Sequence, residues 1–205
     1  RETGRIDVVW FGNGDNPIFP VGLTDVAAFA PVLQPLVVSG FDVRMRVLTN
    51  LRAMKSDNLA RLRGLPIPLL LEEWSEAGEE EARDSSLISF IPVNHQNFSI
   101  AKSLNRGISA LTGGTQILSA GFDLYSGIGE FVYRDAESIL ADLATDTLRL
   151  RPDTVSALET CMDGLADPAN EARRLLTFLR GLQDGSKAGA RLLHANRKTP
   201  RAMIH

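Results

Sequence analysis

The sequence predicts an α/β domain with a parallel sheet and helices on both faces. Short apolar runs rich in β-branched residues alternate with helical segments through most of the chain, and this alternation indicates right-handed βαβ crossovers. The run at 87–91 is almost continuously apolar, which is typical of a strand that is covered on both faces. A hydrophobic content of 44% suits a chain that buries a core.

The individual elements follow from the apolar periodicity. We expect the first strand at 6–11, ending at Gly12, then a turn-rich loop and a helix over 23–38. The remaining strands are expected at 43–48, 67–71, 87–91 and 116–118, with an acidic helix end at 79–84 and a helix at 104–112.

The pattern after residue 135 contains helices only, over about 135–145, 153–165 and 168–183. We expect these helices to pack as a C-terminal helical cap, and we predict a single domain over residues 1–184. The segment 185–205 is basic and has little periodicity, so it is interpreted as a tail.

Charge and cysteine content narrow the class of partner. A net charge of −3 argues against a domain that coats nucleic acid or an anionic membrane. No apolar stretch approaches the roughly 18 to 20 residues of a transmembrane helix. The single Cys161 cannot form an internal disulfide, so a reducing, cytoplasmic compartment is expected. Because the chain starts at Arg1 without an initiator Met or a signal core, we expect a fragment of a longer protein.

The segment 90–118 carries the pattern that is most informative about function. It contains a strand, a polar loop and a helix with Arg106 in the first turn. We expect Ser103 to serve as the N-cap of this helix. Gly113 or Gly114 is expected to supply the left-handed turn at its end.

The start of this helix is expected at the carboxyl edge of the sheet, where ligands bind in open α/β folds. The N–H groups of a first helical turn form an anion site, Lys102 adds a mobile positive charge, and Arg106 can present a planar fork to two phosphate oxygens. These residues predict a diphosphate site, or they are solvated charges of an amphipathic helix. The residues expected along this edge are Gly12, Asn94, Lys102 and Ser119.

The same segment resembles a known family. Three features carry the resemblance: the strand ending in Ile91-Pro92-Val93, the run Lys102-Ser103-Leu104-Asn105-Arg106, and the helix that leads through Gly113-Gly114 into a strand. They are similar to the donor-domain signature of glycosyltransferases with the B-type fold, which has two Rossmann-like domains. The opening Trp10-Phe11-Gly12-Asn13 also looks like that domain's first strand and glycine turn. The resemblance covers about residues 5–145 and is most specific at 102–118. The donor and diphosphate site that we predict consists of Gly12, Asn13, His95, Lys102, Ser103, Asn105, Arg106 and Ser109.

Two positions depart from the family pattern. Many retaining members place two glutamates eight residues apart around this helix start, one at the sugar and one at the ribose hydroxyls, and the matching residues here are Ala101 and Ser109. Alanine cannot replace a carboxylate that accepts two hydrogen bonds from a ribose diol, whereas Ser109 can keep one weaker contact. Either the donor is held differently or its binding has been weakened or lost.

The leading hypothesis is glycosyl transfer from a nucleotide diphosphate sugar as substrate, without a further cofactor. Lys102, Asn105 and Arg106 then stabilise the leaving diphosphate, while no catalytic residue is assigned. The resemblance implies a second, acceptor-binding domain or subunit as partner. The alternatives are a non-catalytic Rossmann-like binding or interaction module, and a nicotinamide-dependent enzyme, for which the glycine fingerprint is incomplete.

Several other polar residues have a structural interpretation beside a functional one. His95 can touch phosphate or transfer a proton, or lie in a surface loop without a chemical role. Arg52 and Lys55 can flank a diphosphate or belong to a solvated helix face. Asp15 and Asn16 are typical of a turn. No metal site is predicted, because no His or Cys cluster has ligand spacing.

Two further segments complete the candidates. The acidic run at 79–81 is interpreted as surface charge. The small residues 119–121 follow the last clear strand, with Tyr125 nearby. They can border the donor site, and structural packing explains them equally well.

Overall fold

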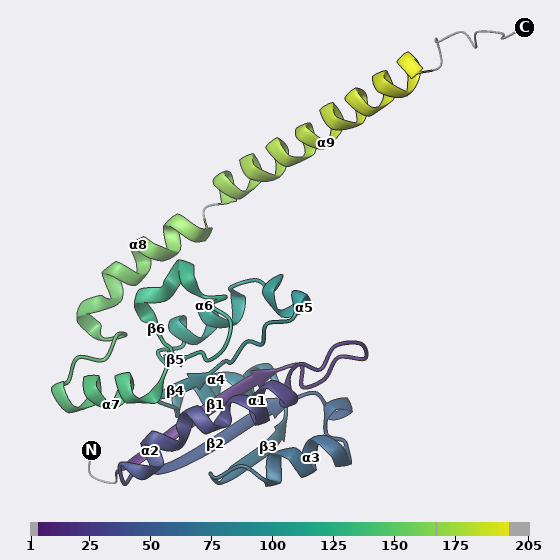
Figure 1. The fold of residues 1–205 in the computed structure, drawn as a ribbon. Helices are drawn as coiled ribbons and strands as arrows, with labels where there is room; N and C mark the ends of the chain where they lie inside the picture. Colours follow the sequence, from purple (N-terminus) through teal and green to yellow (C-terminus); the bar gives the residue numbers. More distant parts are fainter. Residues whose placement is uncertain (1–3, 167, 197–205) are drawn as a thin grey trace, which may run out of the picture. The chain divides into compact units, whose positions relative to one another are not determined.

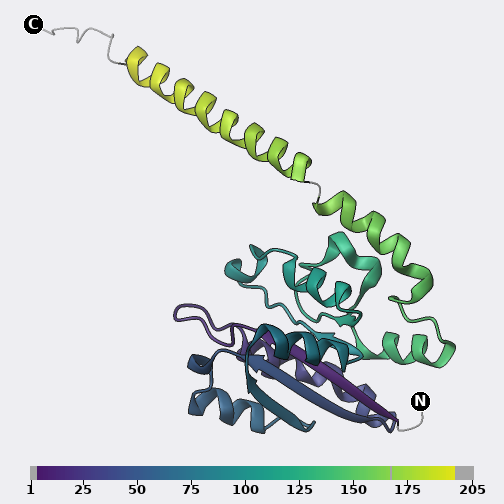
Figure 2. The ribbon, with the colours of Figure 1, turned by 180° about the vertical axis from the view of Figure 1, so that it is seen from behind.

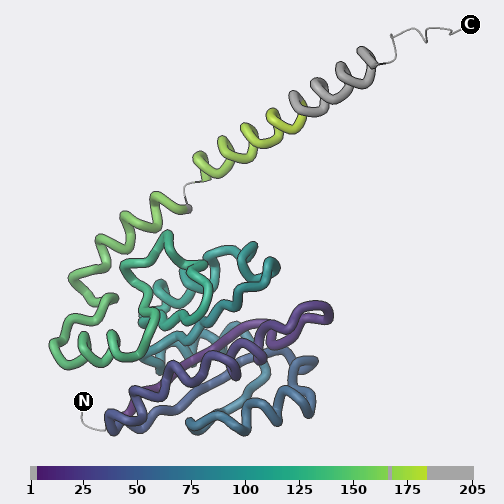
Figure 3. Tube along the Cα trace, in the orientation of Figure 1, coloured from purple at the N-terminus to yellow at the C-terminus, as the bar shows by residue number. Residues whose placement is uncertain are grey.

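The computed structural model describes residues 4–166 and 168–196, with side chains described over 4–165 and 168–183. Figure 3 traces the chain and colours the residues whose side chains are described. The chain divides into two compact units, Arg1–Leu158 and Glu159–His205. Each unit is described by itself.

The first unit contains a six-stranded sheet in which all strand pairs are parallel (Figure 1). The strand order β3-β2-β1-β4-β5-β6 confirms the predicted Rossmann-like α/β fold. The strands are β1 (Arg5–Gly12), β2 (Asp42–Thr49), β3 (Leu69–Glu73), β4 (Ile88–Phe90), β5 (Gln116–Leu118) and β6 (Val132–Tyr133).

Helices cover both faces of this sheet. The helices α1 and α2 lie in front of it in Figure 1, and α4 comes to the front when the molecule is turned in Figure 2. Side chains alternate between the two faces along β1: Val8 and Trp10 belong to the large core cluster, whereas Val9 and Phe11 pack with Ala82 of α4. The helices of the sheet unit up to residue 145 are α1 (Leu23–Phe29), α2 (Gln34–Val38), α3 (Ser56–Arg63), α4 (Glu76–Asp84), α5 (Asn97–Ile100), α6 (Asn105–Thr112) and α7 (Ala136–Thr145).

Prolines explain where the observed elements differ from the predicted ones. The helix predicted over 23–38 is divided by the 3-10 helix Ala30–Leu33, since Pro31 has no N–H to continue an α-helical ladder. The strand β3 begins at Leu69 instead of residue 67, because Pro68 cannot donate to a neighbouring strand.

Several short elements were not predicted from the sequence. Among them are α5 with four residues, β6 with two, and the 3-10 helices Leu51–Ala53 and Ser126–Phe131. All are too short for a helical or alternating apolar period to become visible. The predicted strands near 43–48, 87–91 and 116–118 and the helix near 104–112 are confirmed within one or two residues.

Helices also make up the second unit. The helix α8 (Val155–Ala166) begins at the end of the first unit and follows a 3-10 turn at Pro152–Thr154, and α9 (Pro168–Asn196) has 29 residues. The predicted boundary at residue 184 therefore falls within α9, while 197–205 of the predicted tail lie outside the described residues. The cap arrangement and the single domain over 1–184 remain predictions. In the part of the chain that the structure describes, none of the helices combines the length and apolar character that crossing a membrane requires.

Candidate functional site

The crevice at the switch point of the sheet is the candidate functional site. The chain passes from β1 to β2 on one side, and β4 lies on the other side of β1, so the strand order reverses between β1 and β4. Ligands bind at the carboxyl edge of such a point in open α/β sheets. Because all six strands are parallel, the loops that follow Gly12, Phe90 and Leu118 start along this one edge, as the sequence predicts.

Arg106, on α6, lies against the end of β1. Its guanidinium carbon is 5.3 Å from the centre of the Trp10 ring. Gly12 has a φ of +140°, and a Cβ there would come within 2.3 Å of Arg106 Nη2. Gly12 is therefore needed both for its backbone conformation and for the space that the guanidinium occupies.

The guanidinium of Arg106 makes no hydrogen bond or ion pair to any residue that the structure describes. Burial lowers the pKa of Arg106, an effect that electrostatic interactions with Tyr125, Asp25 and Glu79 oppose. An arginine nonetheless stays charged in proteins. A partly buried positive charge without hydrogen-bond acceptors is unfavourable, so this position is suited to an anion that supplies them.

Lys102 provides a second positive charge near Arg106. Its ammonium lies 5.3 Å from the centre of the Phe98 ring. Although the side chain is largely exposed, partial burial of the ammonium and the charge of Arg106 lower the pKa of Lys102, against the opposing influence of Asp25. An anion placed between the two cations relieves their mutual repulsion.

Asp25, on α1, holds the loops after β1 and β4 together. The Asn94 amide donates to Asp25 Oδ1 at 2.7 Å, and the Gly22 N–H donates to Oδ2 at 3.1 Å. Burial raises the pKa of Asp25, while these hydrogen bonds and the charges of Lys102 and Arg106 act to lower it. Asp25 was not predicted from the sequence, although an acidic residue three positions after a glycine at a helix start was a visible signal.

The loop after β1 is also fixed from β2. Thr49 Oγ1 donates to the Gly12 carbonyl at 2.9 Å, and the Gly14 N–H donates to Asn50 Oδ1 at 2.9 Å. A Cβ on Gly14 would lie 2.4 Å from Thr49 Oγ1. The glycine pair therefore allows tight packing of this turn against the end of β2.

A cavity of about 530 Å³ opens next to Gly12. Trp74, which is 46% exposed, presents its indole here and donates from Nε1 to Glu79 Oε2 at 2.6 Å. The Glu79 side chain is only 15% exposed, and its Oε1 accepts from Ser109 Oγ at 3.3 Å. The interpretation of Glu79 as surface charge was therefore wrong, since its carboxylate is enclosed by these partners. The cavity is lined by Gly12, Asn13, Asn50, Leu51, Glu73, Trp74 and Glu79.

The prediction that Ser103 caps α6 was wrong. The helix begins at Asn105, and the capping position is taken by Leu104, which has no side-chain oxygen and already has helical dihedral angles of −74° and −3°. The first helical hydrogen bond runs from the Ile108 N–H to the Leu104 carbonyl, one residue later than a Ser103 cap requires. At the other end, Gly114 has a φ of +81°, as predicted for the left-handed turn.

The other predicted site residues are distributed unevenly. Asn13 is exposed and lines the cavity. Asn105 is exposed and makes no hydrogen bond to a described residue. His95 is exposed and packs edge-on against Phe122 of the loop after β5, with 5.9 Å between ring centres. Ser109 contacts α4, where its Oγ accepts from Arg83 at 3.2 Å.

The structure thus brings Gly12, Asn13 and Arg106 to one place, with Lys102 close enough to influence Arg106 electrostatically. It does not place His95 among the residues lining this cavity, and it turns Ser109 toward α4. Within the described ranges, no group of three or more His, Cys, Asp or Glu side chains is arranged to hold a metal ion.

In comparisons with known proteins, no family model matches the sequence, and no curated protein is significantly similar to it. The class of protein that the fold defines is a Rossmann-like α/β protein. Its function has to be inferred from the chemistry of the site.

Proposed function

We propose that this chain is the donor-binding domain of a glycosyltransferase and binds a nucleotide diphosphate sugar at the switch point of its sheet. The observation that carries the proposal is the guanidinium of Arg106, which lies against Gly12 without a hydrogen bond or ion pair to the described part of the chain. A diphosphate offers several charged acceptors to such a planar donor.

The cations are arranged to suit a leaving group. Charge develops on the diphosphate as the bond to the sugar breaks, and fixed positive groups stabilise that charge most when they are already in position. Arg106 is held in place by packing on Trp10, and the exposed Lys102 adds a second positive charge nearby. The N–H groups at the start of α6 add to this positive environment.

The adjoining cavity is suited to the nucleoside. The exposed indole of Trp74 offers a flat surface on which a base can stack. Glu79 lies beside Ser109, the residue that matches the ribose-binding glutamate of the family. A carboxylate from α4 thereby stands close to where α6 carries a serine, and it can accept from the ribose diol.

Sugar transfer is proposed to require a second domain or subunit that holds the acceptor. Positioning two reactants together contributes roughly 7 to 11 kcal/mol to lowering a barrier, and a donor domain positions only one of them. Mixed with nucleotide sugars and candidate acceptors, this chain alone is expected to release no diphosphate at a useful rate. Robust acceptor-dependent release would refute the need for the second domain.

The second candidate function is a non-catalytic binding module that keeps the fold. It is favoured by the exposed Ala101 at one glutamate position and by Ser109 at the other, where the hydroxyl is occupied by Arg83 and Glu79. The two candidates differ in whether a nucleotide binds at all.

Calorimetry of the full chain with uridine and guanosine diphosphates tests the donor proposal. At least one is expected to bind, and Arg106→Ala should weaken binding by about ten- to a hundredfold because a charge-assisted contact is lost. Arg44→Ala is the matched control, since Arg44 is near the start of β2 and pairs with Asp42. If neither nucleotide binds the unsubstituted chain, the donor proposal fails and the binding module is favoured.

A further inference from the structure

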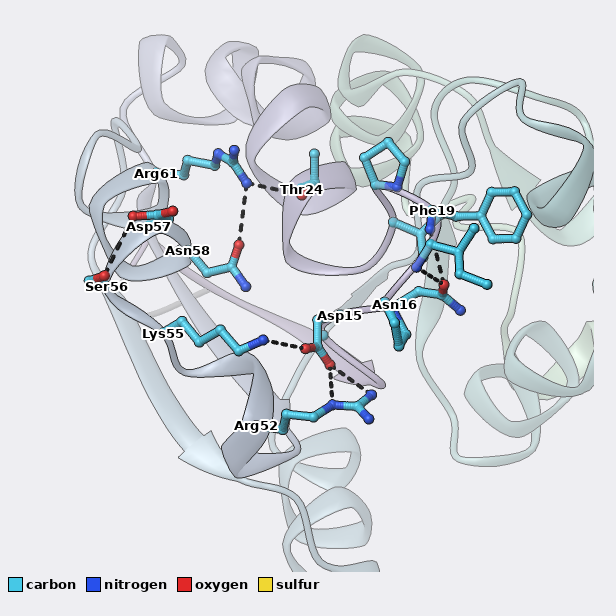
Figure 4. A pocket seen from close by; sticks show the side chains of 15 residues that line it. Asp15, Asn16, Phe19, Thr24, Arg52, Lys55, Ser56, Asp57, Asn58 and Arg61 are labelled. Atoms are coloured by element: carbon cyan, nitrogen blue, oxygen red, sulfur yellow. Dashed lines mark hydrogen bonds and ion pairs between the residues drawn. The ribbon is translucent and has the colours of Figure 1, made fainter.

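A second, larger cavity is lined by the loop after β1 and by residues of α3 (Figure 4). Its volume is about 710 Å³, within the range of roughly 300 to 1,000 Å³ that is typical of small-molecule sites. It shares no lining residue with the cavity beside Trp74. The residues around it are Gly14, Asp15, Asn16, Pro17, Ile18, Phe19, Pro20, Val21, Thr24, Arg52, Lys55, Ser56, Asp57, Asn58 and Arg61.

Two of its cations share one carboxylate. Arg52 Nε donates to Asp15 Oδ1 at 3.1 Å, and Lys55 Nζ donates to Oδ2 at 3.4 Å. Although burial acts to raise it, hydrogen bonds from Asn50, Arg52 and Lys55 lower the pKa of Asp15, so this carboxylate is ionised at neutral pH. The Arg52 and Lys55 side chains are 59% and 65% exposed. Such ion pairs are weak, so either cation can turn toward a ligand.

Arg61, on α3, is the third cation and is not paired with a carboxylate in the described structure. Its Nη1 donates to Thr24 Oγ1 and to Asn58 Oδ1, both at 3.3 Å and both neutral (Figure 4). The remaining carboxylate of the lining, Asp57, accepts from Ser56 Oγ at 3.4 Å. Three cations therefore face two carboxylates, and the cavity keeps a net positive charge.

The loop after β1 lines the cavity with apolar side chains, in contrast to the charged side chains of the opposite wall. Pro17, Ile18 and Phe19 are apolar, and Figure 4 shows Phe19 across from Arg61. Asn16 Oδ1 accepts from the N–H groups of Ile18 and Phe19 at 2.9 and 3.0 Å, which fixes the shape of this loop. A ligand here meets cations and hydroxyl or amide groups on one side and apolar surface on the other.

We infer that this cavity binds a second ligand, an organic anion whose phosphate monoester or carboxylate is carried on a sugar-like polyol. Guanidinium groups bind both anions through paired N–H donors. The hydroxyls of Thr24 and Ser56 suit the polyol, and the apolar wall suits the C–H face of a sugar ring. The inference does not depend on the nucleotide site, because the two cavities are lined by different residues.

Calorimetry of the full chain at low salt tests this inference with glucose 6-phosphate, glucuronate, glucose and inorganic phosphate. At least one anionic sugar is expected to bind at least tenfold more tightly than glucose and than phosphate alone, and the preferred one identifies the anion. Phosphate binding as tightly as glucose 6-phosphate, or no binding of either anionic sugar, would overturn the inference.

Variants of α3 locate the site. Arg61→Ala should weaken binding of the preferred sugar by about tenfold or more, and Lys55→Ala should weaken it less because Lys55 is already paired with Asp15. Arg63→Ala is the matched control, since it removes the same charge from the same exposed helix outside the cavity lining. Equal losses for Arg61→Ala and Arg63→Ala would reduce the binding to general surface attraction. Thermal unfolding of each variant establishes that it is folded. Arg106→Ala should leave the affinity for the preferred sugar unchanged, and this result is expected whether or not the chain binds a nucleotide.

Discussion

Two arginines on neighbouring helices illustrate how a structural charge differs from one that we propose to bind a ligand. Arg83 of α4 donates from Nη1 to the Ser109 carbonyl at 2.6 Å and to Ser109 Oγ at 3.2 Å, and its Nε is 3.8 Å from Glu79. Arg106 of α6 has none of these contacts with the described residues and lies on Trp10 beside Gly12. The chain thus provides acceptors for Nη1 of Arg83, although Arg83 Nε is buried without a hydrogen bond, whereas the half-buried guanidinium of Arg106 has no acceptor among the described residues.

Replacing Arg83 gives the largest effect on stability that this comparison predicts. Arg83→Ala removes the charged donor that joins α4 to α6 and should lower the free energy of unfolding by about 2 to 3 kcal/mol. Denaturant unfolding measures the loss, and nucleotide affinity of the folded variant should stay close to the original. A stability equal to that of the unsubstituted chain would show that the contacts of Arg83 contribute little to the free energy of unfolding. Arg83 would then no longer be an example of a structural arginine.

Replacing Gly12 tests whether the backbone at this position determines where the Arg106 guanidinium lies. The new Cβ in Gly12→Ala pushes Arg106 away, and a positive φ adds strain of about 1 to 3 kcal/mol for a residue other than glycine. Nucleotide affinity should fall toward the value of Arg106→Ala, and the double variant should be no worse than Arg106→Ala, since both changes remove one contact. Additive losses in calorimetry would mean that Gly12 acts independently of Arg106.

Replacing Trp74 tests the contact to the base independently of the contacts to the phosphates. Trp74→Ala removes a stacking surface and should cost about 1 to 2 kcal/mol of nucleotide affinity, with little change in the unfolding midpoint because Trp74 is 46% exposed. The loss should be the same for a nucleoside and for its diphosphate. A loss confined to the diphosphate would place the base elsewhere.

The fold could be predicted from the sequence because buried parallel strands are continuous apolar runs. Residues 87–91 and 116–118 stand out for this reason, and the turn residues between the elements set their limits. The short α5 and β6 could not be predicted, since their stability comes from neighbouring elements rather than from a local pattern.

The candidate site could be predicted only in part. Arg106 and Gly12 were identified because a helix start and a strand end meet at the carboxyl edge of a parallel sheet. The Asn94–Asp25 and Ser109–Glu79 contacts join residues 69 and 30 positions apart, and no spacing rule connects such pairs. Ser103 failed as a cap because the backbone conformation of Leu104 delays the start of α6 by one residue.

The most direct test of the account is the affinity of uridine diphosphate, uridine monophosphate and uridine for the unsubstituted chain and for Arg106→Ala. If Arg106 binds a diphosphate, the substitution should weaken diphosphate binding by about ten- to a hundredfold. It should weaken monophosphate binding less and leave the affinity for uridine unchanged. Its unfolding free energy should be unchanged or higher, because a half-buried charge without an acceptor in the described chain has been removed. An equal loss for all three ligands, or a loss of stability like that of Arg83→Ala, would contradict the central claim and make Arg106 a structural residue.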